Sequence, residues 1–449
     1  MKIRSLIVAA LVFFVLAGIL YWSEHHQPGE DSAKASADAP PAILKLDAST
    51  ITRLEIKKKD EKPIILTKAE SGKWQITAPQ SFSADQTVVS GILSTLSSLD
   101  SQRVVEDKAA DPKPYGLEPP AVQLNVAEKG DKVQKLLIGD NTPTGGATYV
   151  MLAGDSRVFT AATYATSAVD KSLNDLRDKR LLTVNPDKIS RIELVKKTQD
   201  IDFGRNKDGW QILKPQPLRA DTFQISELVR KLTDAKMDLS SSDTKAAVSA
   251  FAHATPVATA KVTDESGAQE LQVRKRQGDK TQGDKTQDAY YAKSSIVDGI
   301  HKIDSDLGQA LEKGPDDFRN KKLFDFGFAE PNRVELHAGS KAYFFTRSGD
   351  VWWQDGKKMD AGNVQSFLSK LRDLAADKFP ASGFANPIIA ITVTSDDGKR
   401  VEKVLIAKSK EDYLGKRENE PALYQLNSAS VDDLQKAAEE MKPAATAGK

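Results

Sequence analysis

Cysteine is absent from this 449-residue chain. Its absence excludes disulfide bonds, thiolate zinc sites, a cysteine nucleophile and lipid attachment through an N-terminal cysteine. Histidine is scarce as well, and its five residues show no H-x-x-H or H-E-x-x-H spacing: His25, His26, His253, His301 and His337. We therefore predict ordinary apolar cores, no metal site and no cofactor.

The sequence patterns of common catalytic sites are also missing. The chain contains no G-x-S-x-G nucleophile elbow, no Walker phosphate loop and no G-x-G-x-x-G dinucleotide loop. A pair of carboxylates for glycoside hydrolysis has no local sequence pattern, so an envelope hydrolase stays as a less favoured alternative. Because no segment breaks the repetition described below, we predict that the chain is not an enzyme.

Neither sign of charge dominates the chain. Lysine and arginine total 64, aspartate and glutamate total 63, and the two signs are interspersed. Such a surface does not attract the phosphates of nucleic acid in particular, so we predict no nucleic-acid partner. The composition does not define a small-molecule ligand.

The one long apolar run lies near the N-terminus. Lys2 and Arg4 precede residues 6–22, and these 17 residues reach the lower limit for spanning a bilayer. The positive-inside rule places residues 1–5 in the cytoplasm and the rest of the chain outside. We predict a single-pass anchor in the inner membrane, with the C-terminal region periplasmic or extracytoplasmic.

A cleavable signal peptide is the alternative to an anchor. The small residues that could form a cleavage site, Ala33, Ala35 and Ala37, lie more than ten residues beyond the apolar run, which disfavours cleavage. Residues 23–41 contain few large apolar side chains, so we predict a disordered stalk there.

Three similar segments follow the stalk. ITRLEI, ISRIEL and PNRVEL place Arg53, Arg191 and Arg333 at spacings of 138 and 142 residues, each within an alternating strand pattern. A tryptophan followed by glutamine comes about twenty residues later, at Trp74, Trp210 and Trp353. We predict that these tryptophans pack in the cores, with stacking on a sugar ring as the alternative.

Each segment then shows a helix and further strands. Asp85, Asp221 and Asp360 suit N-caps, and apolar residues follow at one-sided helical spacing. Strand patterns introduced by Pro120, Pro256 and Pro387 come next. The predicted fold class is α+β: three tandem repeats, each a mostly antiparallel sheet with one covering helix, after a single transmembrane helix.

The repeat boundaries follow from a second recurring segment. LRDKRLL from Leu176 and FRNKKLF from Phe318 each lead into the next repeat. We predict repeats over residues 42–182, 183–324 and 325–441, and a disordered tail over 442–449.

An arginine and a glutamate two residues apart recur in the first strand of every repeat, so each pair lies on one face of its strand. The pairs are Arg53 with Glu55, Arg191 with Glu193, and Arg333 with Glu335. We predict a solvated face or cross-strand charge pairing. A stripe that docks a partner is the functional alternative.

YGLEPP at residues 115–120, followed by an alternating strand, resembles the most recognisable motif of the bacterial family called domain of unknown function 4340. SGFANP at 382–387 is a weaker copy, and FAHATP at 251–256 matches in spacing only. The resemblance covers roughly residues 42–440. It implies a membrane helix followed by repeats, and for some members a non-enzymatic auxiliary role beside gliding-motility-type ABC transporters.

These observations favour a membrane-anchored, non-enzymatic accessory or scaffold of the bacterial envelope, such as an auxiliary component of an ABC-type transporter. Its expected partners are the membrane, through residues 6–22, and envelope or transporter proteins. A tethered cell-wall or glycan-binding module is the alternative.

Overall fold

The computed structural model describes residues 42–130, 132–207, 209–240, 244–278, 288–327 and 331–444. The chain divides into two compact units between Asp178 and Lys179. Within the described residues, no helix has both the length and the apolar character needed to cross a membrane. The predicted cytoplasmic segment 1–5, anchor 6–22 and stalk 23–41 lie outside these residues.

The first unit contains one antiparallel sheet. Its strands are β1 (Ile51–Lys58), β2 (Ile64–Lys68), β3 (Trp74–Ala78), β4 (Phe82–Ser83), β5 (Arg103–Glu106), β6 (Val122–Glu128), β7 (Val133–Asn141), β8 (Ala147–Leu152) and β9 (Val158–Ala162). They are ordered β4-β3-β2-β1-β6-β7-β8-β9-β5. Because β1 pairs with both β2 and β6, two meanders meet at the centre of the sheet.

The second unit contains two eight-stranded sheets with the same order. One consists of β10 (Arg191–Val195), β11 (Ile201–Asn206), β12 (Gly209–Lys214), β13 (Leu218–Arg219), β14 (Thr255–Asp264), β15 (Gly267–Arg276), β16 (Ala289–Ser294) and β17 (Ile300–Ile303). The other consists of β18 (Arg333–Ala338), β19 (Lys341–Ser348), β20 (Val351–Gln354), β21 (Lys357–Lys358), β22 (Ile389–Ser395), β23 (Arg400–Ser409), β24 (Asp412–Arg417) and β25 (Leu423–Leu426). The three predicted repeats are therefore present.

The first helix of each repeat forms as predicted. These helices are α2 (Gln86–Ser97), α5 (Thr222–Thr233) and α8 (Ala361–Asp373), and the carboxylates of Asp85, Asp221 and Asp360 accept hydrogen bonds from their first turns. Their predicted apolar faces are buried against the sheets, apart from Val229, which is partly buried. Burial of this stripe holds each helix on its sheet.

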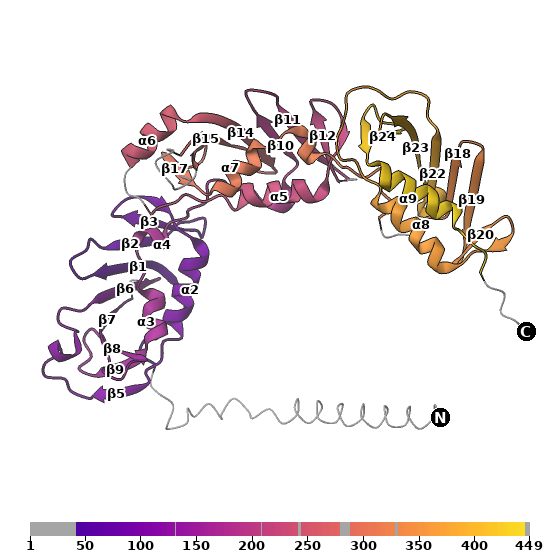
Figure 1. Ribbon diagram of the computed structural model, residues 1–449. Helices are drawn as coiled ribbons and strands as arrows, with labels where there is room; N and C mark the ends of the chain where they lie inside the picture. The colour runs from indigo at the N-terminus through magenta and orange to yellow at the C-terminus, as the bar shows by residue number, and fades with distance from the viewer. Residues whose placement is uncertain are drawn as a thin grey trace, which may run out of the picture. The chain divides into compact units, whose positions relative to one another are not determined.

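A second helix follows the last strand of each repeat, so the prediction of one covering helix was wrong. α3 (Thr163–Val169), α7 (Ser305–Glu312) and α9 (Ser428–Glu439) lie beside α2, α5 and α8 respectively, on the same face of each sheet (Figure 1). Two further α-helices are the four-residue α4 (Leu173–Leu176) in the first repeat and the ten-residue α6 (Thr244–His253) in the second. Small residues in α3 and α9 weaken the apolar periodicity on which the prediction relied.

Strand pairing corrects the predicted position of one tryptophan. Thr67 pairs with Gln75, Gly204 with Gln211, and Thr346 with Trp353. The counterpart of Trp74 and Trp210 is therefore Trp352. Trp74 and Trp352 are buried and Trp210 is partly buried, whereas Trp353 is 37% exposed on the opposite face.

The segments that link the repeats have two halves. Residues 176–178 and 318–320 pair with the edge strand of the repeat that they leave, through Asp178 N to Ser83 O and Asn320 N to Arg219 O, both 2.9 Å. The next residues pair with the repeat that they enter, because the N–H groups of Leu181 and Leu323 donate to the carbonyls of Ala235 and Leu374.

The repeats consequently begin earlier than predicted. The carbonyls of Lys179 and Lys321 already accept hydrogen bonds from Met237 and Ala376, so boundaries near 179 and 321 replace those at 183 and 325. Residues 442–444, the start of the predicted disordered tail, instead pair with β21 and the two residues after it, and residues 445–449 lie outside the described part of the chain.

Candidate functional site

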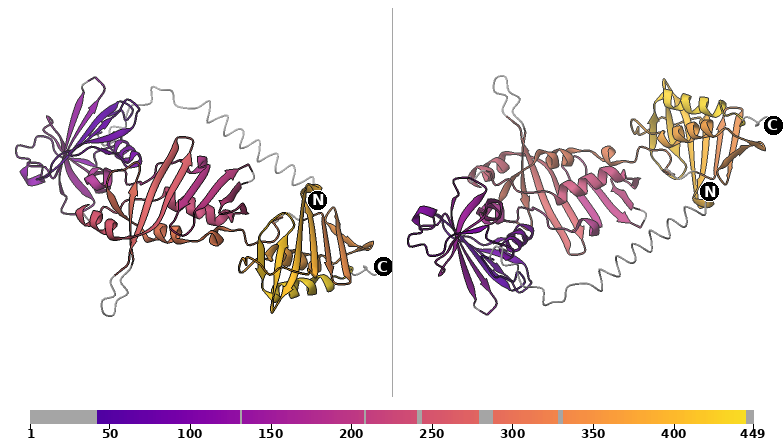
Figure 2. Two further views of the ribbon diagram at one scale, coloured as in Figure 1. Left: turned by 90° about the horizontal axis from the view of Figure 1, so that it is seen from above. Right: turned by 90° about the horizontal axis from the view of Figure 1, so that it is seen from below.

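The three Arg–Glu pairs lie on the sheet faces that the paired helices leave open. In β1, Leu54 and Ile56 are buried beneath the helices, so Arg53 and Glu55 point to the other side. Strands β10 and β18 repeat this arrangement. Figure 2 shows the third sheet with its helices along one side of it. We call these three surfaces the open faces.

Each arginine pairs with its own glutamate. The Nη2–Oε distances are 3.5 Å for Arg53–Glu55, 3.2 Å for Arg191–Glu193 and 2.7 Å for Arg333–Glu335. The arginine side chains are 44–51% exposed. Exposed pairs of this kind contribute little to stability, about 0–1 kcal/mol.

The second open face adds charge pairing across strands. Arg191 Nη2 lies 2.6 Å from Asp202 Oδ2 on β11, and Lys261 Nζ on β14 lies 3.8 Å from Glu193 Oε2. The Asp202 carboxylate raises the pKa of Arg191 through a hydrogen bond and its charge. The predicted cross-strand pairing is therefore present in this repeat, where it favours one register of β10.

Part of the second open face is covered. Arg274 on β15 alternates with the buried Val273, so it points away from α7. Its guanidinium lies 4.5 Å from the ring centre of Phe251 in α6 and donates to the Phe251 carbonyl at 3.1 Å. Helix α6 therefore lies over β15, β16 and β17, and the charged groups lie on β10, β11 and β14.

The third open face differs by its aromatic side chains. Phe344 is 42% exposed and Trp353 is 37% exposed, and His337 contacts Phe344 edge-on at 5.3 Å. Strand pairing places Ile65 and Asp202 at the position of Phe344, and Gln75 and Gln211 at that of Trp353. An aromatic surface beside an Arg–Glu pair is thus found on this face and not at the equivalent positions of the other two.

The YGLEPP segment is held by close packing against β7. A Cβ on Gly139 would lie 2.2 Å from the Tyr115 carbonyl oxygen, and a Cβ on Gly116 would lie 2.4 Å from the Asp140 carboxyl carbon. Tyr115 Oη donates to Glu106 at 2.8 Å, and its ring contacts Tyr149 edge-on. These contacts give the motif a packing role.

Replacing Gly139 with alanine should therefore lower the free energy of unfolding of the first unit by about 1–3 kcal/mol, because the new methyl group meets backbone. Gly91 in α2 is the control, since a Cβ there meets nothing within 4 Å. Gly91→Ala should raise the same free energy by about 0.5–1 kcal/mol through helix propensity. Urea unfolding of both variants measures the difference, and equal shifts would contradict the packing role.

A network of buried and half-buried charges lies within the second unit. Arg219 on β13 lies 2.5 Å from Asp325 and 2.7 Å from Glu420. Arg417 lies 2.7 Å from Glu420 and 3.1 Å from Glu402. Because Arg219 belongs to the second repeat and its partners to the third, the network joins the two repeats.

Tyr424 belongs to the same network, with its hydroxyl 2.6 Å from Glu420 and 3.1 Å from Arg219. Burial raises the pKa of Tyr424 to about 12; Glu420 adds to this effect and Arg219 opposes it.

A free phenol titrates near pH 10, so the unfolded chain loses this proton first. The stability that the protonated Tyr424 contributes is fully present below about pH 10 and is lost as pH rises to about 12, about 3 kcal/mol in all. Tyr424→Phe should lack this loss in urea titrations across that interval. Tyr164→Phe is the control, because Tyr164 is 81% exposed, and it should behave as the parent. If the free energy of unfolding falls equally with pH in the parent and in both variants, the raised pKa of Tyr424 is contradicted.

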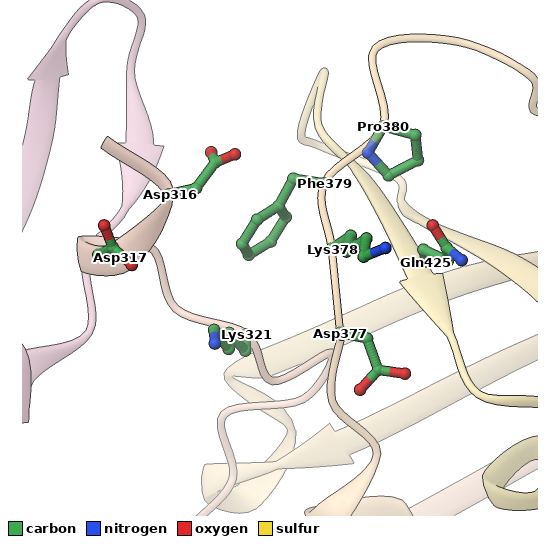
Figure 3. A pocket seen from close by; sticks show the side chains of 8 residues that line it. All are labelled: Asp316, Asp317, Lys321, Asp377, Lys378, Phe379, Pro380 and Gln425. Atoms are coloured by element: carbon green, nitrogen blue, oxygen red, sulfur yellow. The ribbon is translucent and has the colours of Figure 1, made fainter. Parts of the chain in front are cut away.

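A pocket of about 410 Å³ lies next to Tyr424 of this network, and Figure 3 shows the side chains that line it. It is lined by Asp316, Asp317, Lys321, Asp377, Lys378, Phe379, Pro380 and Gln425. The Arg319 guanidinium stacks 3.5 Å from the Phe379 ring centre, and Tyr424 contacts the same ring edge-on. The lining mixes both charges around one aromatic ring and includes no pair of nucleophile and base in contact.

Sequence reasoning found the Arg–Glu pairs and missed both the charge network and the pocket. Arg219 and Asp325 are 106 residues apart, and each is one charge among many in the sequence. No motif marks them. Within the described residues, no group of three or more histidine, aspartate or glutamate side chains is placed to hold a metal ion.

Comparison with curated proteins and with solved structures gave no match. The sequence profile of one family matches residues 74–216 and again residues 210–387, which together are more than half of the chain. The two matches begin at Trp74 and Trp210, which are equivalent residues in the first two repeats. The chain therefore belongs to the family described as Domain of unknown function (DUF4340).

Proposed function

We propose that this chain is a membrane-anchored, non-enzymatic scaffold of the bacterial cell envelope that binds other proteins through the open faces of its sheets. The observation that carries the proposal is an exposed Arg–Glu pair at the same position of three sheets, each on the face opposite the paired helices. A polar sheet face with half-exposed charges suits reversible docking of a protein.

The proposed partner is an envelope complex such as an ABC-type transporter, for which the chain is an auxiliary component. This part of the proposal rests on the resemblance of the repeats to transporter-associated proteins and on the N-terminal apolar run of residues 6–22.

Glycan binding by the third open face is the second candidate. Trp353 and Phe344 are exposed there, and a sugar ring stacks well on an exposed aromatic ring. Trp74 and Trp352 are buried, however, so the repeated tryptophan position does not offer such a surface in all repeats.

Crosslinking in intact cells followed by affinity purification separates the two candidates. The full chain is compared with a secreted fragment that begins at Ala42 and with an unrelated anchored protein. Enrichment of a transporter permease or ATPase with the full chain is the expected result, and the fragment shows whether the repeats or the anchor make the contact. Recovery of cell-wall material without any membrane protein would replace the scaffold with the glycan-binding candidate.

A further inference from the structure

Residues 442–444 of the chain pair with the edge strand of the third sheet. We call this pairing edge, formed by β21 with Met359 and Asp360, the edge slot, and we use the same name for the equivalent edges of the other two sheets. Asp360 N donates to Lys442 O at 2.9 Å, Ala444 N donates to Lys358 O at 2.8 Å, and Met359 pairs with Pro443. Residues 442–444 therefore lie in the slot as an added strand.

The first two repeats hold different occupants in the same slot. Asp85 N donates to Leu176 O and Asp221 N donates to Phe318 O, both at 2.8 Å, and Arg177 and Arg319 pair with Ala84 and Ala220. The occupants are residues 176–178 (Leu-Arg-Asp) and 318–320 (Phe-Arg-Asn). The three slots thus share one main-chain pattern and differ in side chains.

Buried side chains anchor the first two occupants. Leu176 and Phe318 are fully buried, and Phe318 contacts Phe203 edge-on at 5.0 Å. Arg177 stacks over the ring of Phe82 at 4.1 Å. The chemistry that these slots take is therefore a large apolar residue followed by arginine and then by aspartate or asparagine.

The tail lacks these anchors. Lys442 stands at the position of Leu176 and Phe318, Pro443 stands at that of the arginines, and both are exposed. Met441, the residue before the slot, packs partly against the core. Lys442 pairs with Asp360, and the third residue of the tail, Ala444, pairs with the exposed Lys358. An acidic residue in place of Ala444 would complement the charge of this lysine.

We propose that the edge slot binds an extended segment of a partner protein by strand addition, and that residues 442–444 are a displaceable occupant. The segment would have the pattern large apolar residue, arginine, aspartate, because the chain uses this pattern for the same geometry in its first repeat. Main-chain hydrogen bonds would give affinity, and the apolar anchor would give specificity. Binding at the slot is separate from the proposed docking on the open faces, since it needs no envelope component.

A fluorescent peptide with the sequence of residues 173–181 is the probe, and its anisotropy is measured with two purified forms of the chain. One ends at Met441 and the other ends at Ala444. The peptide should bind the shorter form at least tenfold more tightly. A control peptide with Leu176→Ser and Arg177→Ser should bind at least tenfold more weakly than the probe. Equal binding of the two peptides, or no binding to the shorter form, would overturn the proposal.

A second variant keeps the test decisive if the shorter form does not fold. Lys442→Leu, Pro443→Arg and Ala444→Asp together give the full chain the first-repeat occupant, and its control carries serine in place of that leucine. The leucine variant should melt at least about 3 °C higher than the serine control and should not bind the peptide. If the leucine variant and the serine control melt at the same temperature, the slot does not bury an apolar side chain at position 442, which would overturn the proposal.

Discussion

Replacing Arg219 with alanine is expected to lower the free energy of unfolding of the second unit by about 3 kcal/mol. The guanidinium lies 2.5 Å from Asp325 and 2.7 Å from Glu420, and its side chain is 19% exposed. Removing the guanidinium leaves the negative charges of two largely buried carboxylates with less positive charge nearby to balance them. The expected loss is at the low end for a buried pair, because Arg400 and Arg417 stay beside Asp325 and Glu420.

Arg230 on α5 is the matched control for this prediction. It also faces two carboxylates, Glu227 at 2.8 Å and Asp234 at 3.6 Å, but its side chain is 57% exposed. Solvent screens such pairs, so Arg230→Ala should cost no more than about 0.5 kcal/mol. Urea unfolding of the full chain, followed by circular dichroism, measures both variants. Equal losses for the two arginines would show that burial does not strengthen the network.

Replacing either of two adjacent tryptophans with alanine should change the free energy of unfolding by very different amounts. Trp352→Ala is expected to lower the free energy of unfolding of the second unit by about 3–5 kcal/mol, because Trp352 is 5% exposed and its loss leaves a large cavity in the core. Trp353→Ala should cost less than about 1 kcal/mol, since Trp353 lies on the open face.

The same urea unfolding measurement tests this pair. The result decides the register of β20, because the two side chains point to opposite faces of one strand. A larger loss for Trp353→Ala than for Trp352→Ala would reverse the register and restore the alignment of Trp353 with Trp74 and Trp210.

Local periodicity explains why much of the fold could be predicted. The N-cap aspartates and the one-sided apolar stripes of α2, α5 and α8 are encoded within a dozen residues each. The spacing of Arg53, Arg191 and Arg333 gave the repeat number, and the alternation around them placed the Arg–Glu pairs on one face of each strand. Residues close in sequence decide all of these features.

Features that depend on distant contacts could not be predicted in the same way. In VWWQ, at residues 351–354, either tryptophan can face the core, and only the pairing of Thr346 with Trp353 decides between them. The boundary error had a similar cause, because residues 179–182 resemble the end of one repeat in sequence while Leu181 bonds to Ala235 in the next. The partners of Arg219 lie more than one hundred residues away in sequence.

The central claim is that the open faces dock other proteins, and site-specific photocrosslinking in intact cells tests it most directly. A photoreactive amino acid is placed at Gln75 or Gln211 on two open faces, and at Ser90 or Ser226 on the exposed sides of α2 and α5 as matched controls. The scaffold predicts a discrete crosslinked protein from Gln75 and Gln211 that is absent from the helix positions. Crosslinks of equal yield from all four positions, or from the helix positions alone, would contradict it.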